Sequence, residues 1–171
     1  AIVDKVQKHP SNPGKLTMAD LAAYQPRKRT PICHDYAAAG KDYRICGFPP
    51  PSSGAIAVGQ ILGILSNTQA ASLPLQAGVP TPAGPAPSAD WLYLYTEAAR
   101  LAFADRAVYL GDPDFVQPPA GNWMSLLDPA YLAGRAKLIG QAPGAQSMKV
   151  AQPGNPGAVK TSYAPMAPQP E

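Results

Sequence analysis

The positions of the prolines constrain this chain more than any other feature, because proline cannot continue a helix and is confined to the edges of sheets. The 171 residues include 22 prolines and 15 glycines, about a fifth of the chain against a usual share of about 12%. They are concentrated in three stretches. The sequence therefore predicts one compact body with irregular segments, rather than a wholly disordered chain.

The segments between the prolines carry apolar residues at helical spacing. Ser88 is expected to cap the longest helix. Asp128-Pro129 indicates the start of another helix, with Asp128 as the cap and proline at the first helical position. Two segments rich in β-branched and aromatic residues predict strands joined by a turn. The predicted helices cover residues 1–8, 17–25, 55–65, 89–110 and 129–139, the strands cover 30–33 and 43–48, and 66–88 and 140–171 are expected to be irregular.

The same spacing predicts which helix faces are buried. The expected buried residues are Leu21 and Tyr24 in the second helix, Val58, Ile61, Leu62 and Leu65 in the third, and Leu92, Tyr95, Ala99, Ala102 and Phe103 in the longest.

Charge and hydropathy exclude two classes of partner. A net charge of +3 is too small for a nucleic-acid-binding domain, and the one basic run, Arg27-Lys28-Arg29, is expected to be a solvated turn. No segment approaches the roughly 20 apolar residues of a membrane span. No signal peptide opens the sequence. Because the sequence begins within a predicted helix, we expect this chain to be a fragment or a processed piece of a longer protein.

The residue types that most often carry chemistry are few and scattered. His9 and His34 lie 25 positions apart, and adjacent Cys33 and His34 on a strand would point to opposite faces. Two cysteines without a cluster of histidines or carboxylates cannot supply the four ligands of a zinc site. The sequence therefore predicts no metal and no cofactor.

The remaining polar groups have structural explanations. Asp112 and Asp114 flank a proline and favour a turn over a cation site. Ser52 and Ser53 precede a predicted helix and favour a capping role, because no G-x-S-x-G pattern surrounds them. From its residues alone, the chain has an interior but no self-sufficient active site.

The two cysteines suggest a disulfide. Cys33 and Cys46 lie near the ends of the two predicted strands, so a bond between them would close a small loop and stabilise the fold by about 3 kcal/mol. Two buried free thiols are the alternative. A disulfide would indicate an oxidising compartment, so we expect a periplasmic or secreted protein.

Several segments resemble the γ-glutamyltranspeptidase family, which includes related cephalosporin acylases. The first is Leu16 to Tyr24, followed by Arg29-Thr30-Pro31 and Tyr43-Arg44. The most specific pair is Pro49-Pro50-Pro51-Ser52-Ser53-Gly54 and, about 50 residues later, Phe103-Ala104-Asp105-Arg106 with Tyr109 to Phe115. The resemblance covers residues 1 to about 140, and more loosely the rest.

This resemblance implies an α+β fold, as part of an Ntn-hydrolase αββα sandwich. Family members cut themselves into a large and a small subunit, and the new N-terminal threonine of the small subunit is the nucleophile. Residues 1–140 resemble the C-terminal half of the large subunit, and residues 141–171 form a Pro/Gly-rich tail leading to the cleavage site. The implied partners are therefore the small catalytic subunit, the other half of the large subunit and a small γ-glutamyl substrate.

The resemblance assigns no catalytic or substrate-binding residue to this chain. In the family, the nucleophile and the oxyanion-hole glycines lie on the small subunit, and an arginine that pairs with the substrate carboxylate lies earlier in the large one. The family usually has a second glycine after PPPSSG, where this sequence has Ala55. The implied function is cleavage of the γ-glutamyl bond of glutathione and related amides, with transfer to water or amino acids. The alternatives are a cephalosporin acylase or a non-catalytic structural fragment.

Overall fold

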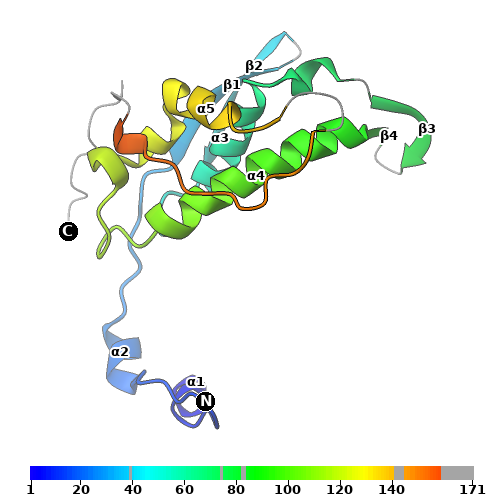
Figure 1. The fold of residues 1–171 in the computed structure, drawn as a ribbon. Coiled ribbons are helices and arrows are strands. Elements are labelled where there is room, and N and C mark those ends of the chain that lie inside the picture. The colour runs from blue at the N-terminus through cyan, green and yellow to red at the C-terminus, as the bar shows by residue number, and fades with distance from the viewer. Residues whose placement is uncertain (39, 74, 82–83, 141–144, 159–171) are drawn as a thin grey trace.

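The computed structural model describes residues 1–38, 40–73, 75–81, 84–140 and 145–158 of the protein. Three helices form the body, and a β-hairpin lies beside one of them (Figure 1). Two short N-terminal helices stand apart from this body at the end of an extended segment. The helices are α1 (Ile2–Gln7), α2 (Met18–Ala23), α3 (Gly54–Leu65), α4 (Ala89–Tyr109) and α5 (Pro129–Ala136), and the strands are β1 (Ile32–Ala38), β2 (Lys41–Gly47), β3 (Leu75–Thr81) and β4 (Gly84–Pro87).

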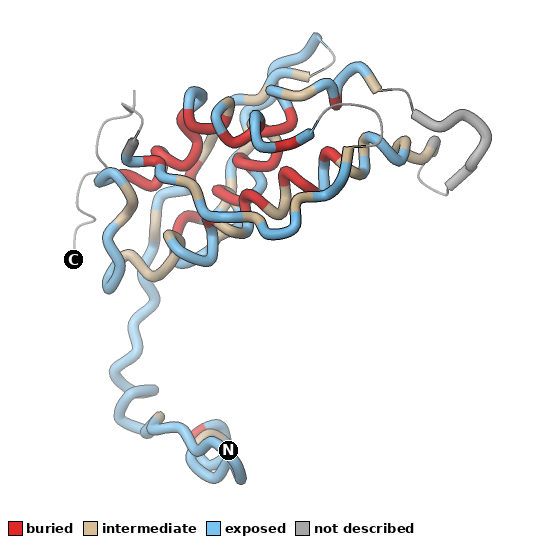
Figure 2. Tube along the Cα trace, viewed as in Figure 1, coloured by how far each residue is buried: buried red, intermediate tan, exposed pale blue. Residues whose placement is uncertain are grey.

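The core consists of two apolar clusters that share α3 and α5. The first fills the space where α3, α4 and α5 meet and includes Ile64, Leu101 and Leu132. The second lies between the hairpin, α3 and a 3-10 segment, η3 (Trp123–Leu127), and includes Ile56 and Trp123. The buried residues follow these elements, whereas the N-terminal arm is almost wholly exposed (Figure 2).

Side-chain caps set the starts of three helices, as their sequences predict. Thr17 and Asp20 form a reciprocal capping box at α2. The Ser88 hydroxyl accepts from the Trp91 amide at α4, and Asp128 caps α5 ahead of Pro129. Ser53 precedes α3, but its hydroxyl instead accepts a hydrogen bond from Arg106 Nε at 2.8 Å.

The hairpin is longer and its turn tighter than predicted. β1 and β2 are seven residues each and pair antiparallel, with Ala38 opposite Lys41. Only residues 39 and 40 therefore form the turn, and Gly40 has a φ of 72°, which glycine adopts without steric cost. A turn of only two residues lets the strand pairing reach further than the sequence pattern indicates.

Cys33 lies directly opposite Cys46, and a disulfide joins them. Their Cα atoms are 4.1 Å apart, slightly below the range of about 4.4–6.8 Å that disulfide geometry predicts. The short distance is close to the roughly 4.5 Å between residues of a non-hydrogen-bonded cross-strand pair.

The predicted buried face of α4 is only partly correct: Ala102 is buried and Ala99 is half-buried, but the larger predicted residues are exposed. Phe103 is 54% exposed and Tyr95 is 42% exposed, whereas Glu97 and Asp105 are buried. Sequence periodicity assigned the apolar face without carboxylates to the core, but both carboxylates find partners inside the protein. The helix is therefore turned so that its aromatic stripe faces outward. Arg100 forms an ion pair with Glu97.

Three smaller predictions are also wrong. Leu21 and Tyr24 are exposed, because α2 lies on the N-terminal arm, apart from the body (Figure 1). Val58 is 46% exposed, because α3 turns its Ile56, Gln60 and Ile64 face to the core. Residues 66–88 are not wholly irregular: they contain a 3-10 turn at Gln69–Ser72 and the antiparallel pair of β3 and β4.

The described part of the predicted tail, residues 145–158, runs along α4 and ends in a 3-10 turn at Pro156–Ala158 (Figure 1). We call residues 145–158 the strap. Residues 159–171, which include the segment resembling the approach to the cleavage site, lie outside the described residues. Among the described helices, none is long and apolar enough to cross a bilayer.

The disulfide predicts a simple chemical result. Alkylation of the unfolded, unreduced protein should label neither Cys33 nor Cys46, and reduction should expose both to labelling, as read by mass spectrometry. Reduction should also lower the free energy of unfolding by about 3 kcal/mol. Two alkylatable thiols in the unreduced protein would contradict the bond.

Replacing Gly59 or Gly134 with alanine is expected to have opposite effects on the free energy of unfolding. A Cβ at Gly59 would lie 2.8 Å from Leu127 Cδ2 and 3.1 Å from the His34 ring, whereas a Cβ at Gly134 would meet nothing within 4 Å. Gly59→Ala should therefore destabilise the protein by about 1–3 kcal/mol through overpacking. Gly134→Ala should stabilise it by about 0.5–1 kcal/mol through helix propensity. Denaturant unfolding of both variants measures this, and equal shifts would show that the packing at Gly59 is misassigned.

Candidate functional site

The two histidines that the sequence singles out are not brought together. His9 lies on the N-terminal arm, where its Nδ1 accepts from the Asn12 amide, while His34 lies in the hairpin. No three His, Cys, Asp or Glu side chains among the described residues are grouped so that they could hold a metal ion. The polar residues that come together in the interior of the body are ones that the sequence did not single out.

The largest buried polar group is centred on Asp105 of α4, which has no exposed surface. Its carboxylate accepts hydrogen bonds from Tyr131 Oη at 2.7 Å, Gln60 Nε2 at 2.8 Å and the Gly154 amide at 2.7 Å. Arg135 Nη2 lies 3.1 Å from Oδ1 and completes an ion pair. We call these five residues the Asp105 cluster; it joins α3, α4, α5 and the strap.

The Asp105 cluster is continued by further bonds to the strap. The other contacts of Arg135 Nη2 are the carbonyls of Leu101 and Gln152. Tyr109 Oη donates to the Gly154 carbonyl at 2.6 Å. The Tyr131 hydroxyl is held as a donor, because burial and the neighbouring Asp105 carboxylate both raise its pKa above the ordinary value. The side chains of the Asp105 cluster therefore have a structural role: they hold the helices and the strap together and do not form an acid–base pair open to substrate.

A second buried carboxylate holds the start of the strap. Glu97, two turns before Asp105 on the same face of α4, is 1% exposed. It accepts from the Met148 amide at 2.9 Å, from Arg100 Nη1 at 3.0 Å and from the Ser147 hydroxyl. Burial alone would raise the pKa of Glu97, but the hydrogen bonds from Ser147, Met148 and Arg100 lower it on balance.

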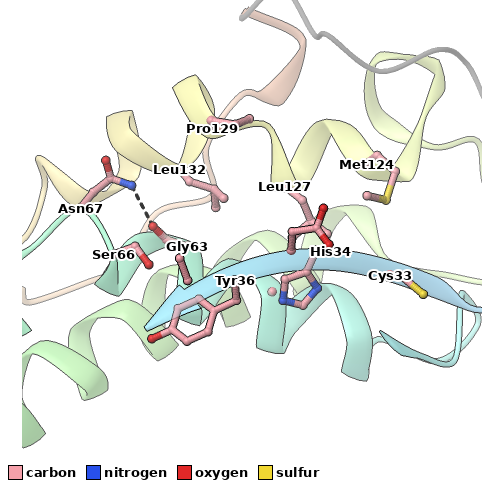
Figure 3. Close-up of a pocket in the computed structure, with 13 residues that line it drawn as sticks. Cys33, His34, Tyr36, Gly63, Ser66, Asn67, Met124, Leu127, Pro129 and Leu132 are labelled. Carbon is pink, nitrogen blue, oxygen red and sulfur yellow. Dashed lines mark hydrogen bonds between the residues drawn. The ribbon is translucent and has the colours of Figure 1, made fainter. Parts of the chain in front are cut away.

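A groove of about 510 Å³ lies beside the hairpin (Figure 3). Five consecutive residues of β1, from Cys33 to Ala37, form one wall. Gly59 and Gly63 of α3 contribute the floor, and the opposite wall comes from η3 and α5. The residues of that wall are Met124, Leu127, Pro129 and Leu132. We call this cavity the β1 groove.

His34 is the one imidazole in the β1 groove, and it rests on Gly59. Both of its ring nitrogens are buried, and neither has a hydrogen-bond partner among the described residues. Burial lowers the pKa of His34, and the neighbouring Asp35 partly opposes that shift. The imidazole is therefore held neutral in a site that supplies it with no partner.

The basic run is solvated in part, as the sequence suggested: Arg27 and Lys28 are exposed, whereas the Arg29 side chain is largely covered. Arg29 Nη2 lies 3.1 Å from Asp114 Oδ2 and 3.6 Å from Asp112 Oδ1, and Arg27 pairs with Asp114 at 3.3 Å. The Asp112 side chain also accepts from the Asp114 amide, as its predicted turn requires. These ion pairs fasten the segment before β1 to the turn after α4.

Sequence reasoning missed the Asp105 cluster because its members are far apart in the chain. Gln60 and Gly154 lie 45 and 49 positions from Asp105, so no local spacing links them. The available signal was the presence of Glu97 and Asp105 eight residues apart on a helix with a strong apolar content. Such a pair on one face is costly unless both carboxylates are satisfied.

Comparison with known proteins identifies the chain's relatives. The family model described as Gamma-glutamyltranspeptidase matches residues 1–168. The chain is 40% identical over 138 residues to a glutathione hydrolase proenzyme of Escherichia coli (strain K12), and 38% identical over 129 residues to the acylase ACY 1 proenzyme of Pseudomonas sp. (strain SE83). These alignments cover 81% and 75% of this chain and 20% of each relative, so the chain spans about a fifth of the length of these curated relatives.

The chain is also similar to solved structures of γ-glutamyltranspeptidases. The γ-glutamyltranspeptidase of Helicobacter pylori aligns with a TM-score of 0.64 at 30% identity, over 95% of this chain and 40% of that one. The enzyme of Pseudomonas nitroreducens complexed with L-DON aligns with a TM-score of 0.59 at 34% identity, over 86% of this chain and 38% of that one.

The lowered pKa of Glu97 predicts a pH-dependent strap. A carboxylate whose folded pKa lies below its ordinary value of 4.5 stabilises the fold above that value and loses the contribution as the pH falls through the folded pKa. The Met148 amide should therefore be protected from hydrogen exchange at neutral pH and lose protection in acid, after correction for intrinsic rates. Glu97→Gln should weaken protection at neutral pH and flatten this dependence. The control is Asp90→Asn, an exposed acid in the first turn of α4, which should change neither; an unchanged pH profile in Glu97→Gln would refute the assignment.

Proposed function

The chain belongs to the gamma-glutamyltranspeptidase family, and from this membership we propose that it is part of an enzyme that cleaves the γ-glutamyl bond of glutathione and related amides. The enzyme would transfer the γ-glutamyl group to water or to an amino acid. The observation that carries the proposal is the family match across residues 1–168, supported by relatives named glutathione hydrolase proenzyme.

The chemistry of this reaction would lie outside the chain. We propose acyl transfer through a threonine ester, with the threonine's own α-amino group as the base. That threonine would open a small subunit released by self-cleavage of a precursor, in keeping with the word proenzyme in the relatives' names. The polar clusters of this chain support the division of labour, because Asp105 and Glu97 are already engaged by the strap.

The part played by this chain would be one helical layer of an αββα Ntn-hydrolase sandwich. The outer face of α4 supports this assignment, since Leu92, Tyr95 and Phe103 lie on one stripe and are all more than two-fifths exposed. Val58 of α3 is exposed to a similar degree. An apolar helix face of this kind is typical of one that packs against another layer of a larger assembly. The partners would be the small subunit and the other half of the large subunit.

The strap would set the path of the chain toward the cleavage site. Residues 146–154 are fixed to α4 and α5 by side chains along their length, from Tyr93 on Gln146 to Asp105 on Gly154. The segment that follows would therefore start from a defined point on the body, which favours a reproducible approach to the cleavage site.

A second enzyme function is favoured by one observation, the 38% identity to the acylase ACY 1 proenzyme. A γ-glutamyltranspeptidase-like cephalosporin acylase would share the architecture and accept a different acyl group. The residues that line the acyl pocket, outside this chain, would separate the two enzymes. A non-catalytic fragment is the third alternative, and a coding sequence without a threonine-led subunit after Glu171 would favour it.

The compartment is also a proposal. A disulfide between Cys33 and Cys46 would form and persist in an oxidising environment, which favours a periplasmic or secreted enzyme.

The proposed function predicts that residues 1–171 alone are inactive. Release of a chromogenic amine from a γ-glutamyl anilide should be absent with this chain and present with the complete protein that contains it. Loss of a single oxyanion donor costs about 100- to 1000-fold in rate, and here the nucleophile would be missing as well.

The control is the complete protein with the small subunit's first threonine replaced by alanine, which should match the isolated chain. Turnover by the isolated chain that survives repurification would place the chemistry within residues 1–171 and contradict the proposal.

A further inference from the structure

The strap is held most closely at one residue, Gly154. Asp105 Oδ1 accepts a hydrogen bond from the Gly154 amide at 2.7 Å, and Tyr109 Oη donates one to the Gly154 carbonyl at 2.6 Å. Both backbone polar groups of this residue are therefore bound by side chains of α4. Tyr131, which donates to the same Asp105 carboxylate, lies against the Cα of Gly154.

The two neighbours of Gly154 cannot take its place. A shift of the strap by one residue in one direction would bring Pro153 to Asp105, and proline has no N–H to donate to the carboxylate. A shift in the other direction would bring Asn155. A Cβ at this position would lie 2.9 Å from Tyr131 Cζ and closer still to the Tyr131 hydroxyl. The position accepts only a residue with an N–H and without a Cβ, so the strap fits the body in one register.

Glu97, the other buried carboxylate that binds the strap, selects the register less sharply. It accepts from the Met148 amide. The residues on either side, Ser147 and Lys149, also carry an amide N–H that could be offered to the carboxylate after a shift. The contact at Gly154 is therefore the more specific of the two attachments.

The ion pair at this point also favours a role in register over a role in stability alone. Replacing a buried ion pair with apolar residues of similar volume is often neutral or stabilising, and the best-attested use of such pairs is to fix a register. Arg135 Nη2, the partner of Asp105, donates to the Gln152 carbonyl at 2.8 Å as well. The same ion pair thus contacts the strap at two residues.

We propose that Asp105, Tyr131 and Gly154 form a register lock, which places the segment after the strap for self-cleavage of the precursor. The proposal rests on the proposed function, because it takes self-cleavage as the reaction. That reaction hydrolyses one peptide bond: water is consumed, and a carboxylate and the α-amino group of the threonine are formed. The three residues would be positioning residues, since the lock gives and takes no proton in this step.

The physical basis is the small displacement that a reacting bond tolerates. A slip of one residue moves the following chain by about 3.3–3.6 Å, and a misplacement of about 1 Å can cost about 100-fold in rate. After the lock, Pro156 is fully buried, and the turn at Pro156–Ala158 packs against η3 and a further 3-10 turn, η2 (Pro119–Gly121). A slip at Gly154 would remove Pro156 from this position, so the end of the strap could not absorb it.

Three glycine variants of the complete protein test the lock. Gly154→Ala should slow self-cleavage at least tenfold, because the new Cβ displaces the strap from Tyr131. Gly157→Ala, the same change in the same segment, should stay within about twofold. Gly59→Ala carries a folding burden far from the strap and should also cleave at close to the unmodified rate. The measurement is the time course of the two subunits on denaturing gels; an equal loss in Gly154→Ala and Gly59→Ala would overturn the inference.

An insertion before the strap separates positioning from stability. One glycine inserted between Gly140 and Ala145 should change self-cleavage by less than about twofold, because the lock restores the register downstream. In the Gly154→Ala background the same insertion should slow self-cleavage at least threefold further, since nothing then restores it. An insertion with the same effect in both backgrounds would show that the two sites are independent, and this would overturn the inference.

Activity on the same samples distinguishes the two proposals. Normal self-cleavage of Gly154→Ala would refute the register lock and leave the proposed function intact. A complete, unmodified protein that never cleaves itself would refute the proposed function and the role of the lock together. The cleaved fraction of Gly154→Ala should release amine from the γ-glutamyl anilide at the unmodified rate per cleaved molecule. A tenfold lower rate would assign the residue to the mature enzyme and overturn its role in maturation.

Discussion

The rest of this structure depends on one buried carboxylate. Asp105 is fully removed from solvent and satisfied by Arg135, Tyr131, Gln60 and the Gly154 amide. Removing one partner of a buried ion pair costs about 3–5 kcal/mol, because the other charge is left uncompensated. The four elements that supply these groups must therefore be in place together, and this couples α3, α4, α5 and the strap in a way that apolar packing alone would not.

The same carboxylate determines which face of α4 is available to partners. With Asp105 and Glu97 directed inward, Tyr95 and Phe103 are directed outward. The strap then covers the polar side, where its amides at Met148 and Gly154 donate hydrogen bonds to the two carboxylates. An aromatic stripe that would otherwise have formed the core is left exposed, and we have proposed that it packs against the remainder of a larger enzyme. The buried hydrogen bonds of Asp105 and Glu97 and the exposed apolar surface of α4 thus both follow from the rotational orientation of this helix.

The sequence was sufficient for features that depend on neighbouring residues. Ser88 and Asp128-Pro129 mark the starts of α4 and α5 because capping is decided within three or four positions. Motifs such as PPPSSG and GDPDF indicated the family for the same reason. The face of α4 and the path of the strap could not be predicted, because they depend on bonds between residues about 50 positions apart. Apolar periodicity also treats every carboxylate as solvent-exposed, and it therefore chose the wrong face for Phe103.

The disulfide fixes the pairing register of the β1–β2 hairpin. A two-stranded hairpin is only marginally stable in water, and a slip of one residue would exchange its two faces. The bond between Cys33 and Cys46 fixes the register, and Gly40 in the tight turn agrees with it. A slip would direct the backbone of His34 and Tyr36 outward and expose the imidazole that now rests on Gly59. Because the register is fixed covalently, the backbone groups of Cys33, Asp35 and Ala37 remain directed away from β2, and the His34 imidazole remains on the α3 side of the hairpin.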